Sequence, residues 1–263
     1  MWKQNSKTKY PIIVSIEGNI GSGKSTLMTQ LKKHYQSNKE ILFVDEPVNE
    51  WMKITDDDDG KNMIEKFYSD QKKYSFAFQM MAYISRLKLI KSALKNNADY
   101  RIIITERSVN TDKNVFAKML YDEGNMESVE YQIYNKWFYD FMKEIPAPSI
   151  IYIKTSPVIA KARVDKRQRL GEDIPLDYLI KCNDYHENWL NNSEENESIL
   201  KLDGNIEMIE GDGKYIEWIK IINSFIGIEM SSANKEDDFK VQESELIKDV
   251  HFVGRALNPF PRS

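Results

Sequence analysis

The sequence has a single cysteine, no long apolar segment and no excess of basic side chains. Cys182 alone cannot form an intramolecular disulfide, which favours a reducing, intracellular compartment. No window approaches the roughly 20 apolar residues of a membrane-spanning helix, so we expect a soluble, cytoplasmic protein that does not enter a membrane. The 37 Lys and Arg against 41 Asp and Glu give a formal net charge of −4, which leaves no surplus of cations to neutralise a nucleic acid polymer. Polynucleotide binding is therefore not expected.

The two ends of the chain are more polar than its centre. Residues 1–10 include basic residues but no apolar segment typical of a signal peptide, so we expect a short disordered lead. Residues 228–263 form a polar tail whose role the sequence does not define, with a candidate amphipathic helix near residues 244–250. Over the whole chain, 41% apolar and 30% charged residues are typical of a globular protein. We therefore expect one folded domain over residues 11–227.

Short apolar runs rich in Ile and Val recur along this domain. None alternates cleanly between apolar and polar residues, which is typical of strands buried on both faces of a parallel sheet. Helical patterns separate them, so we predict an α/β fold with an open, parallel five-stranded sheet flanked by helices. The predicted strands are residues 12–16, 41–44, 102–105, 150–153 and 199–202, and the predicted helices are about 24–36, 62–96, 111–144, 156–166, 175–191 and 213–226.

A glycine-rich stretch, "GNIGSGKST", lies between the first predicted strand and the first predicted helix. It satisfies G-x-x-x-x-G-K-[ST] in the context that this phosphate-binding motif requires. Its glycines allow successive backbone N–H groups to point at phosphate oxygens, and the helix N-terminus adds partial positive charge. We predict a site for ATP, with Lys24 at the β and γ phosphates and the Ser25 hydroxyl at Mg²⁺. The expected ATP-binding residues of this loop are Gly18, Asn19, Gly21, Ser22, Gly23, Lys24, Ser25 and Thr26.

Charged residues follow the next two predicted strands. Glu46 follows one strand in "DEPVNEW", and Glu106 and Arg107 follow another in "TERSVNTD". The crevice of an open α/β sheet lies at the carboxyl ends of its strands, so these groups should lie beside the bound phosphates. There, Glu46 could accept a proton from an attacking hydroxyl, and Arg107 could neutralise charge on a transferred phosphoryl group. The alternative for Glu46 is an acidic loop residue without a catalytic role, and the alternative for Glu106 and Arg107 is a surface ion pair.

The long helical pattern at residues 67–87 places Phe78, Gln79, Ala82 and Arg86 near one face. Glutamine can pair with the edge of a nucleobase, and aromatic rings can stack on one. The alternative is that most of these aromatic side chains belong to the core.

Three arginines lie within or shortly before the charged run at residues 166–173. Arg163 and Arg167 share a helical face, and Arg169 could reach in from the following loop. Three arginines that converge on a triphosphate suit phosphoryl transfer, so we expect an arginine-rich lid. A solvated basic face is the alternative.

Taken in order, these motifs resemble the deoxynucleoside kinase family, which includes deoxycytidine, deoxyguanosine and mitochondrial thymidine kinases. The resemblance covers about residues 11–226 and depends on "GNIGSGKST", "EPVNEW", "FAFQMMAYISR", "ERSVNTD", and "RVDKRQR" followed by "IPLDYL". It implies a P-loop NTPase-type fold and ATP-dependent, Mg²⁺-assisted phosphorylation of the 5′-hydroxyl of deoxynucleosides for nucleotide salvage. It also implies a homodimer.

The resemblance implies a role for each matching residue. Glu46 corresponds to the general base, Arg107 to its neighbour that steadies the base and the phosphoryl group, and Lys24 completes the catalytic set. Glu106 corresponds to the carboxylate that holds Mg²⁺ with Ser25. The implied nucleoside site comprises Trp51, Tyr68, Phe78, Gln79, Ala82, Arg86, Arg107, Asp112 and Glu172, and the implied ATP site adds Arg163, Arg167, Arg169, Asp203 and Asn205.

Two of these residues bear on which base is accepted. Family members that prefer cytosine or purines have an arginine and an aspartate at the positions of Arg86 and Asp112, whereas thymidine-accepting members have small or apolar residues there. The resemblance therefore implies use of deoxycytidine, deoxyadenosine or deoxyguanosine in preference to thymidine. The lid is one residue shorter than the family pattern, so Asp173 is an alternative to Glu172 for contacting the 3′-hydroxyl.

Two other functions are compatible with the same fold. A deoxynucleoside monophosphate kinase would need cationic groups where Glu46 lies, because a carboxylate repels a monophosphate. A non-catalytic nucleotide-binding subunit would be free to lose Lys24, Glu46 or Arg107, and all three are present.

Overall fold

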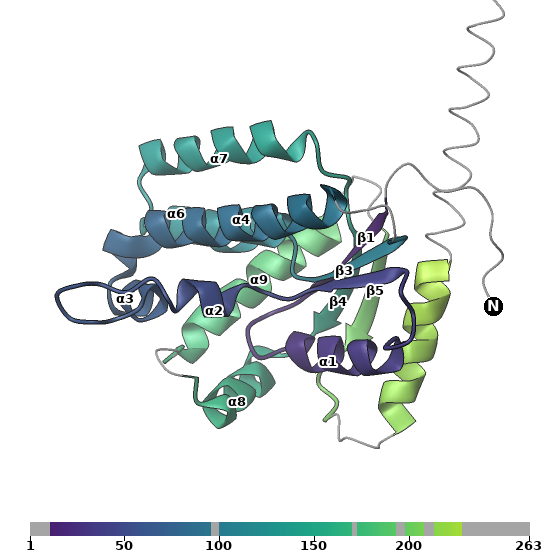
Figure 1. The fold of residues 1–263 in the computed structure, drawn as a ribbon. Helices are drawn as coiled ribbons and strands as arrows, with labels where there is room; N and C mark the ends of the chain where they lie inside the picture. The colour runs from purple at the N-terminus through teal and green to yellow at the C-terminus, as the bar shows by residue number, and fades with distance from the viewer. Residues whose placement is uncertain (1–10, 96–99, 170–172, 193–197, 208–212, 228–263) are drawn as a thin grey trace, which may run out of the picture.

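The protein is described by a computed structural model over residues 11–95, 100–169, 173–192, 198–207 and 213–227 (Figure 1). The predicted lead, the polar tail and Glu172 lie outside these residues. The five predicted strands are confirmed, and all their pairings are parallel, in the order β2-β3-β1-β4-β5. The strands are β1 (Ile12–Glu17), β2 (Ile41–Val44), β3 (Ile102–Glu106), β4 (Ser149–Lys154) and β5 (Ile199–Asp203).

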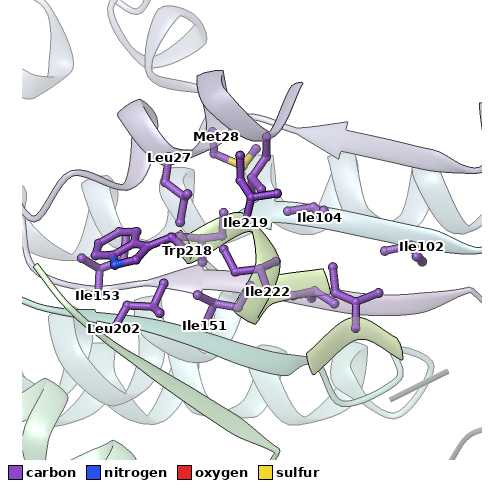
Figure 2. Close-up of a cluster of buried hydrophobic side chains, with 14 of the residues drawn as sticks. Leu27, Met28, Ile102, Ile104, Ile151, Ile153, Leu202, Trp218, Ile219 and Ile222 are labelled. Carbon is purple, nitrogen blue, oxygen red and sulfur yellow. The ribbon is translucent and has the colours of Figure 1, made fainter. Parts of the chain in front are cut away.

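One face of the sheet is covered by α1 (Lys24–His34) and by the helical residues 213–227, which together bury an aliphatic core (Figure 2). Val14 and Ile16 of β1 point into this core because side chains alternate along a strand. Ile13 therefore faces the opposite side, where it packs with residues of α4 (Gln71–Lys95) and α7 (Ser128–Met142). The result is an α/β/α sandwich (Figure 1), and its central strand has apolar residues on both faces.

Two of the predicted helices are wrong in extent. The pattern at 62–96 is two helices, because Asp70 adopts φ −152° between them and an Asn62–Glu65 capping box starts the first. The pattern at 111–144 is interrupted by a π-helical turn and again near Gly124, whose φ is 73°. The remaining helical segments are α2 (Val48–Trp51), α3 (Met63–Ser69), α5 (Val109–Thr111), the π-helical turn η1 (Asp112–Ala117), α6 (Lys118–Asp122), α8 (Pro157–Arg167) and α9 (Leu176–Asn192).

The phosphate-binding loop is packed tightly between β1 and the helices behind it. Gly21 has φ 79°, and a Cβ atom there would lie 2.4 Å from the Ala160 carbonyl oxygen of α8. The Asn19 side chain donates to the Leu179 carbonyl of α9 at 2.8 Å. The loop is therefore held in place by two helices that come much later in the sequence.

None of the helices in the described part of the chain combines the length and apolar content needed to cross a membrane.

Candidate active site

A single cavity of about 460 Å³ opens at the carboxyl ends of the strands and brings most of the predicted site residues together. It runs from the phosphate-binding loop, past the ends of β2 and β3, to the middle of α4. The predicted residues that line it are Gly21, Gly23, Lys24, Ser25, Thr26, Glu46, Trp51, Tyr68, Phe78, Gln79, Ala82, Arg86, Glu106, Arg107, Asp112, Arg163, Arg167 and Arg169. Gly18, Asn19 and Ser22 belong to the same loop and are not part of the lining.

The phosphate end of the cavity contains one buried cation and one hydroxyl–carboxylate pair. Lys24 Nζ donates to the carbonyl oxygens of Gly18 at 3.0 Å and Asn19 at 2.7 Å. Ser25 Oγ donates to Glu106 Oε1 at 2.7 Å. This pair presents hard oxygen atoms, the ligand type that Mg²⁺ prefers alongside substrate phosphates and water. The residues present therefore fit a magnesium ion.

The ammonium group of Lys24 is poorly stabilised by the protein itself. Burial, together with the nearby Arg107, lowers the pKa of Lys24 to about 7 against the opposing effect of Glu106 and Glu46. A bound triphosphate would supply the missing negative charge and raise the pKa of Lys24 again. We therefore expect the binding of ATP to be coupled to the protonation of this residue.

We expect the affinity for ATP to fall as the pH rises above 7. The free protein loses the Lys24 proton near pH 7, whereas the complex keeps it, so each binding event takes up as much as one proton. Linkage then raises the Kd of ATP by up to about tenfold per pH unit until the pKa of the complex is reached. Calorimetric titrations at about pH 7.5 and about pH 9, in buffers of different ionisation enthalpy, measure the Kd of ATP and the number of protons taken up on binding. A Kd independent of pH with no proton uptake would contradict this prediction, and Lys24→Met is the control in which the dependence should vanish.

The centre of the cavity holds two arginines and two carboxylates in alternation. Glu46 Oε1 accepts from Arg107 Nη1 at 2.7 Å and from Arg86 Nη2 at 2.9 Å. Arg86 Nε donates to Asp112 Oδ2 at 2.9 Å, and its Nη1 donates to the Glu106 carbonyl at 2.8 Å. We call Glu46, Arg86, Arg107 and Asp112 the charged cluster.

Burial and charge pairing oppose one another in this cluster. Burial would raise the pKa of Glu46, but Arg107 and Arg86 outweigh it and hold that pKa well below its usual range. For Asp112, whose side chain is 2% exposed, burial raises the pKa although Arg86 opposes the shift. Glu46 is therefore ionised at neutral pH, whereas the charged form of Asp112 is favoured chiefly by Arg86 and less by Arg107.

The far end of the cavity is aromatic. The rings of Trp51 and Phe78 meet edge to face at 5.8 Å, and Phe78 stacks on Phe67 at 4.4 Å. The indole N–H of Trp51 donates to Ser85 Oγ at 2.8 Å, which fixes the plane of that ring. Gln79 lines the cavity and is 2% exposed, and its Oε1 has no hydrogen bond partner within the described protein. An amide with an unpaired acceptor beside flat rings suits the edge of a nucleobase.

The arginine-rich lid lies over the phosphate end. Arg163 donates to the Ser22 carbonyl at 3.3 Å and to the Ile206 carbonyl at 3.1 Å, so it connects the loop to the segment after β5. Asp203 is the last residue of β5, and Asn205 lies in the segment that follows, where its Oδ1 accepts from the Ser156 N–H at 2.8 Å. Neither of these two residues lines the cavity.

Sequence reasoning missed five lining residues. The ring centroid of Phe116 lies 5.3 Å from the guanidinium carbon of Arg107. Phe116 is four residues after Asp112 on η1, so helical spacing from Asp112 could have identified it. Lys166 lies between Arg163 and Arg167 and was the one cation of that run left out. The other three, which are apolar and carry no chemical signal, are Ile20, Val48 and Ile64.

Residues 14–227 match the family model for deoxynucleoside kinase. A fowlpox virus (strain NVSL) protein named as a probable deoxycytidine kinase is 39% identical over 208 residues, which cover 78% of this chain and 80% of that protein. Deoxycytidine kinase 2 of Gallus gallus is 35% identical over 196 residues, covering 67% of this chain and 73% of its own length. Deoxycytidine kinase of Homo sapiens is 33% identical over 197 residues, covering 67% and 74%.

Proposed function

Because this chain belongs to the deoxynucleoside kinase family and is an ATP-dependent kinase of deoxynucleosides, we propose that Glu46 is its general base. The observation that supports this role is the position of Glu46. Its carboxylate lies in the cavity that also contains Lys24 and Ser25, and two arginines orient it. The ion pairs keep it ionised and therefore able to accept a proton.

We propose the following division of labour in the transfer. The nucleoside 5′-hydroxyl gives its proton to Glu46, and its oxygen bonds to the γ-phosphorus of ATP as the bond to the bridging oxygen of ADP breaks. Arg107 and Lys24 face the negative charge that this exchange redistributes, and the lid arginines supply further positive charge. Ser25 and Glu106 would hold Mg²⁺, which supplies charge neutralisation at the phosphates when bound. These assignments use no covalent intermediate.

The charged cluster also supports a choice of base. Asp112 and Arg86 polarise the end of the cavity, which disfavours the 5-methyl group of thymine, and the unpaired Gln79 oxygen favours a base that carries an exocyclic amine. Cytosine and adenine both have such an amine, and so does guanine. The relatives named as deoxycytidine kinases agree with this choice. We propose that deoxycytidine or a purine deoxynucleoside is preferred over thymidine.

A panel of acceptors tests this function. With ATP and Mg²⁺, we expect radiolabelled product from deoxycytidine, deoxyadenosine or deoxyguanosine, and much less from thymidine. The corresponding monophosphates should give none, because Glu46 would repel a 5′-phosphate. Product from monophosphates alone would overturn the assignment of Glu46, and strong thymidine use would overturn only the assignment of base preference.

The remaining site residues are assigned by motif and position. We propose that Arg163, Arg167 and Arg169 contact the triphosphate of the donor, and that Asp203 and Asn205 contact its adenine. Tyr68 is assigned to the sugar, with Glu172 or Asp173 as the second contact to the 3′-hydroxyl. Glu172 lies outside the described residues. We further propose residues 11–227 as the kinase domain and an intracellular location.

We propose that the protein is a homodimer through α4 and α7. Three apolar side chains of α7, spaced four residues apart, are exposed: Val129 at 57%, Ile133 at 41% and Trp137 at 43%. Ile84 of the adjacent α4 is 48% exposed, and the Tyr83 hydroxyl donates to the Trp137 carbonyl, so these helices are directly connected. An apolar stripe along two packed helices is the kind of surface that a second copy covers in an isologous dimer.

Replacing Ile133 with aspartate should dissociate this dimer, because the interface would then bury an unpaired charge. Light scattering coupled to gel filtration at micromolar concentration should show a dimer for the wild type and a monomer for Ile133→Asp. The matched control is Ile216→Asp, since Ile216 is 58% exposed on the helix of residues 213–227. A monomeric wild type, or a dimer that Ile133→Asp leaves intact, would contradict the proposal.

A further inference from the structure

Glu17 is a buried carboxylate that none of the roles above uses. It is the last residue of β1, is 0% exposed, and directly precedes Gly18 of the phosphate-binding loop. Its Oε1 accepts from the backbone N–H of Ser108 at 2.8 Å, and its Oε2 accepts from the hydroxyl of Thr111. Both donors lie in the segment that follows β3. One carboxylate therefore connects the end of β1 to the turn that carries Arg107.

The backbone of that turn has an unusual conformation. Arg107 has φ 62°, in the left-handed region that residues other than glycine rarely adopt and that persists only where the surroundings hold it. The Arg107 N–H donates to the Ile16 carbonyl at 3.0 Å. The next N–H, that of Ser108, is the one that donates to Glu17. The peptide groups on both sides of the Arg107 Cα are thus held by the last two residues of β1.

This conformation determines where two members of the charged cluster lie. It directs the Arg107 guanidinium to Glu46, at 2.7 Å, and places it over the ring of Phe116. The second partner of Glu17, Thr111, directly precedes Asp112, which contacts Arg86. Loss of the Glu17 acceptors would leave the Ser108 N–H buried without a partner and would release the turn from its conformation.

We propose that Glu17 is a positioning residue for phosphoryl transfer, because it holds the Arg107–Thr111 turn so that Arg107 reaches Glu46. This inference rests on the role proposed for Arg107. Glu17 contacts neither reactant in this account and acts mainly through the turn, since its charge has only a small upward effect on the pKa of Lys24. Its removal should therefore affect the chemical step more than the binding of ATP.

The primary test compares Glu17→Met with Glu17→Gln. Methionine keeps the volume but removes both acceptors, so kcat should fall by about 10- to 100-fold, as small misplacements of a catalytic group do, while the KM for ATP stays within about threefold. Glutamine should restore kcat to within about threefold of the wild type, because its oxygen can accept from Ser108 and its amide can donate to the Thr111 hydroxyl. Ser15→Ala, at a buried site on the same face of β1, is the control and should leave kcat unchanged.

A double-mutant cycle separates positioning from a general structural role. Arg107→Ala alone should lower kcat, and Glu17→Met should add little further loss in that background because both changes remove the same interaction. If Glu17→Met does not fold, Thr111→Val removes one of the two hydrogen bonds, and kcat should fall by about three- to tenfold. Full kcat in Glu17→Met, failure of glutamine to restore it, or multiplicative losses in the cycle would overturn the proposal. An unaffected Arg107→Ala would instead overturn the role proposed for Arg107.

Discussion

Glu46→Gln is expected to lower kcat by about 10²-fold or more, the range for loss of a general base. Glutamine keeps the volume and one oxygen that can accept from Arg86 and Arg107, so the cavity should keep its shape. What the variant loses is the site that receives the proton of the 5′-hydroxyl. ATP does not contact this group in the proposed arrangement, so the Kd of ATP should stay within about threefold of the wild type.

Steady-state assays and calorimetric ATP titrations on the same preparations measure kcat and the Kd of ATP. The matched control is Asp45→Asn, because Asp45 is the neighbouring carboxylate, its side chain is 60% exposed and it pairs with Lys32 at the surface. That variant should keep its kcat. Activity that survives in Glu46→Gln would show that another group accepts the proton, and a parallel loss of ATP binding would assign Glu46 to the structure of the site instead.

The pH dependence provides a further check on the same residue. Arg107 and Arg86 hold the pKa of Glu46 well below its usual range, although burial alone would raise it. A general base with a depressed pKa is ionised and active above that pKa, and it loses its activity by protonation only below it. Glu46 should therefore produce no acid limb in kcat/KM between about pH 5.5 and about pH 7. The ratio of wild-type to Glu46→Gln activity should stay constant over this interval.

The second large effect is on stability. Arg86 is 3% exposed and contacts both Glu46 and Asp112, so Arg86→Met removes the guanidinium that the buried Asp112 shares with the partly buried Glu46. Breaking a buried ion pair from one side typically costs roughly 3–5 kcal/mol, because the partner is left without compensation. Urea denaturation at pH 7 should show a loss of this size. Arg101→Met is the control, since Arg101 Nη1 lies 3.9 Å from Glu40 Oε2 in a partly exposed pair, and it should change stability by less than about 1 kcal/mol.

Two outcomes connect this loss to Asp112. Burial raises the pKa of Asp112, so without Arg86 this carboxyl should take up a proton on folding, and the variant should recover part of its stability as the pH falls from 7 to about 5. Adding Asp112→Ala to Arg86→Met should also recover stability at pH 7, because no buried charge is then left at that position. An Arg86→Met variant as stable as the wild type would contradict the expectation.

The double variant Arg86→Met with Asp112→Ala also tests the choice of base. Glu46 loses one of its two arginine partners in it, so turnover should fall with every acceptor. The informative quantity is thus the ratio of thymidine to deoxycytidine phosphorylation, which should rise as the polar end of the cavity becomes apolar. An unchanged ratio would mean that other residues exclude thymidine.

The motifs and the strands could be predicted from local sequence. Ile102, Ile103 and Ile104 are apolar in succession because a central parallel strand is covered on both faces, and that requirement is visible without any partner. The Lys24 loop follows from spacing alone, since a strand, a glycine turn and a helix are contiguous in the chain. Helix ends were less predictable. The breaks at Asp70 and Gly124 depend on single backbone conformations inside otherwise continuous helical patterns.

What the sequence by itself determined is therefore the succession of strands along the chain, the phosphate-binding loop and the inventory of charged groups at the carboxyl ends of the strands. Only the tertiary structure decided how those groups pair. Glu46 and Arg86 are 40 residues apart, and Glu17 and Ser108 are 91 apart. The packing of α4 beside the carboxyl end of β3, where Arg86 donates to the Glu106 carbonyl, and the left-handed backbone of Arg107 bring these partners together. Such contacts depend on packing between distant segments, and no local pattern of residues encodes them.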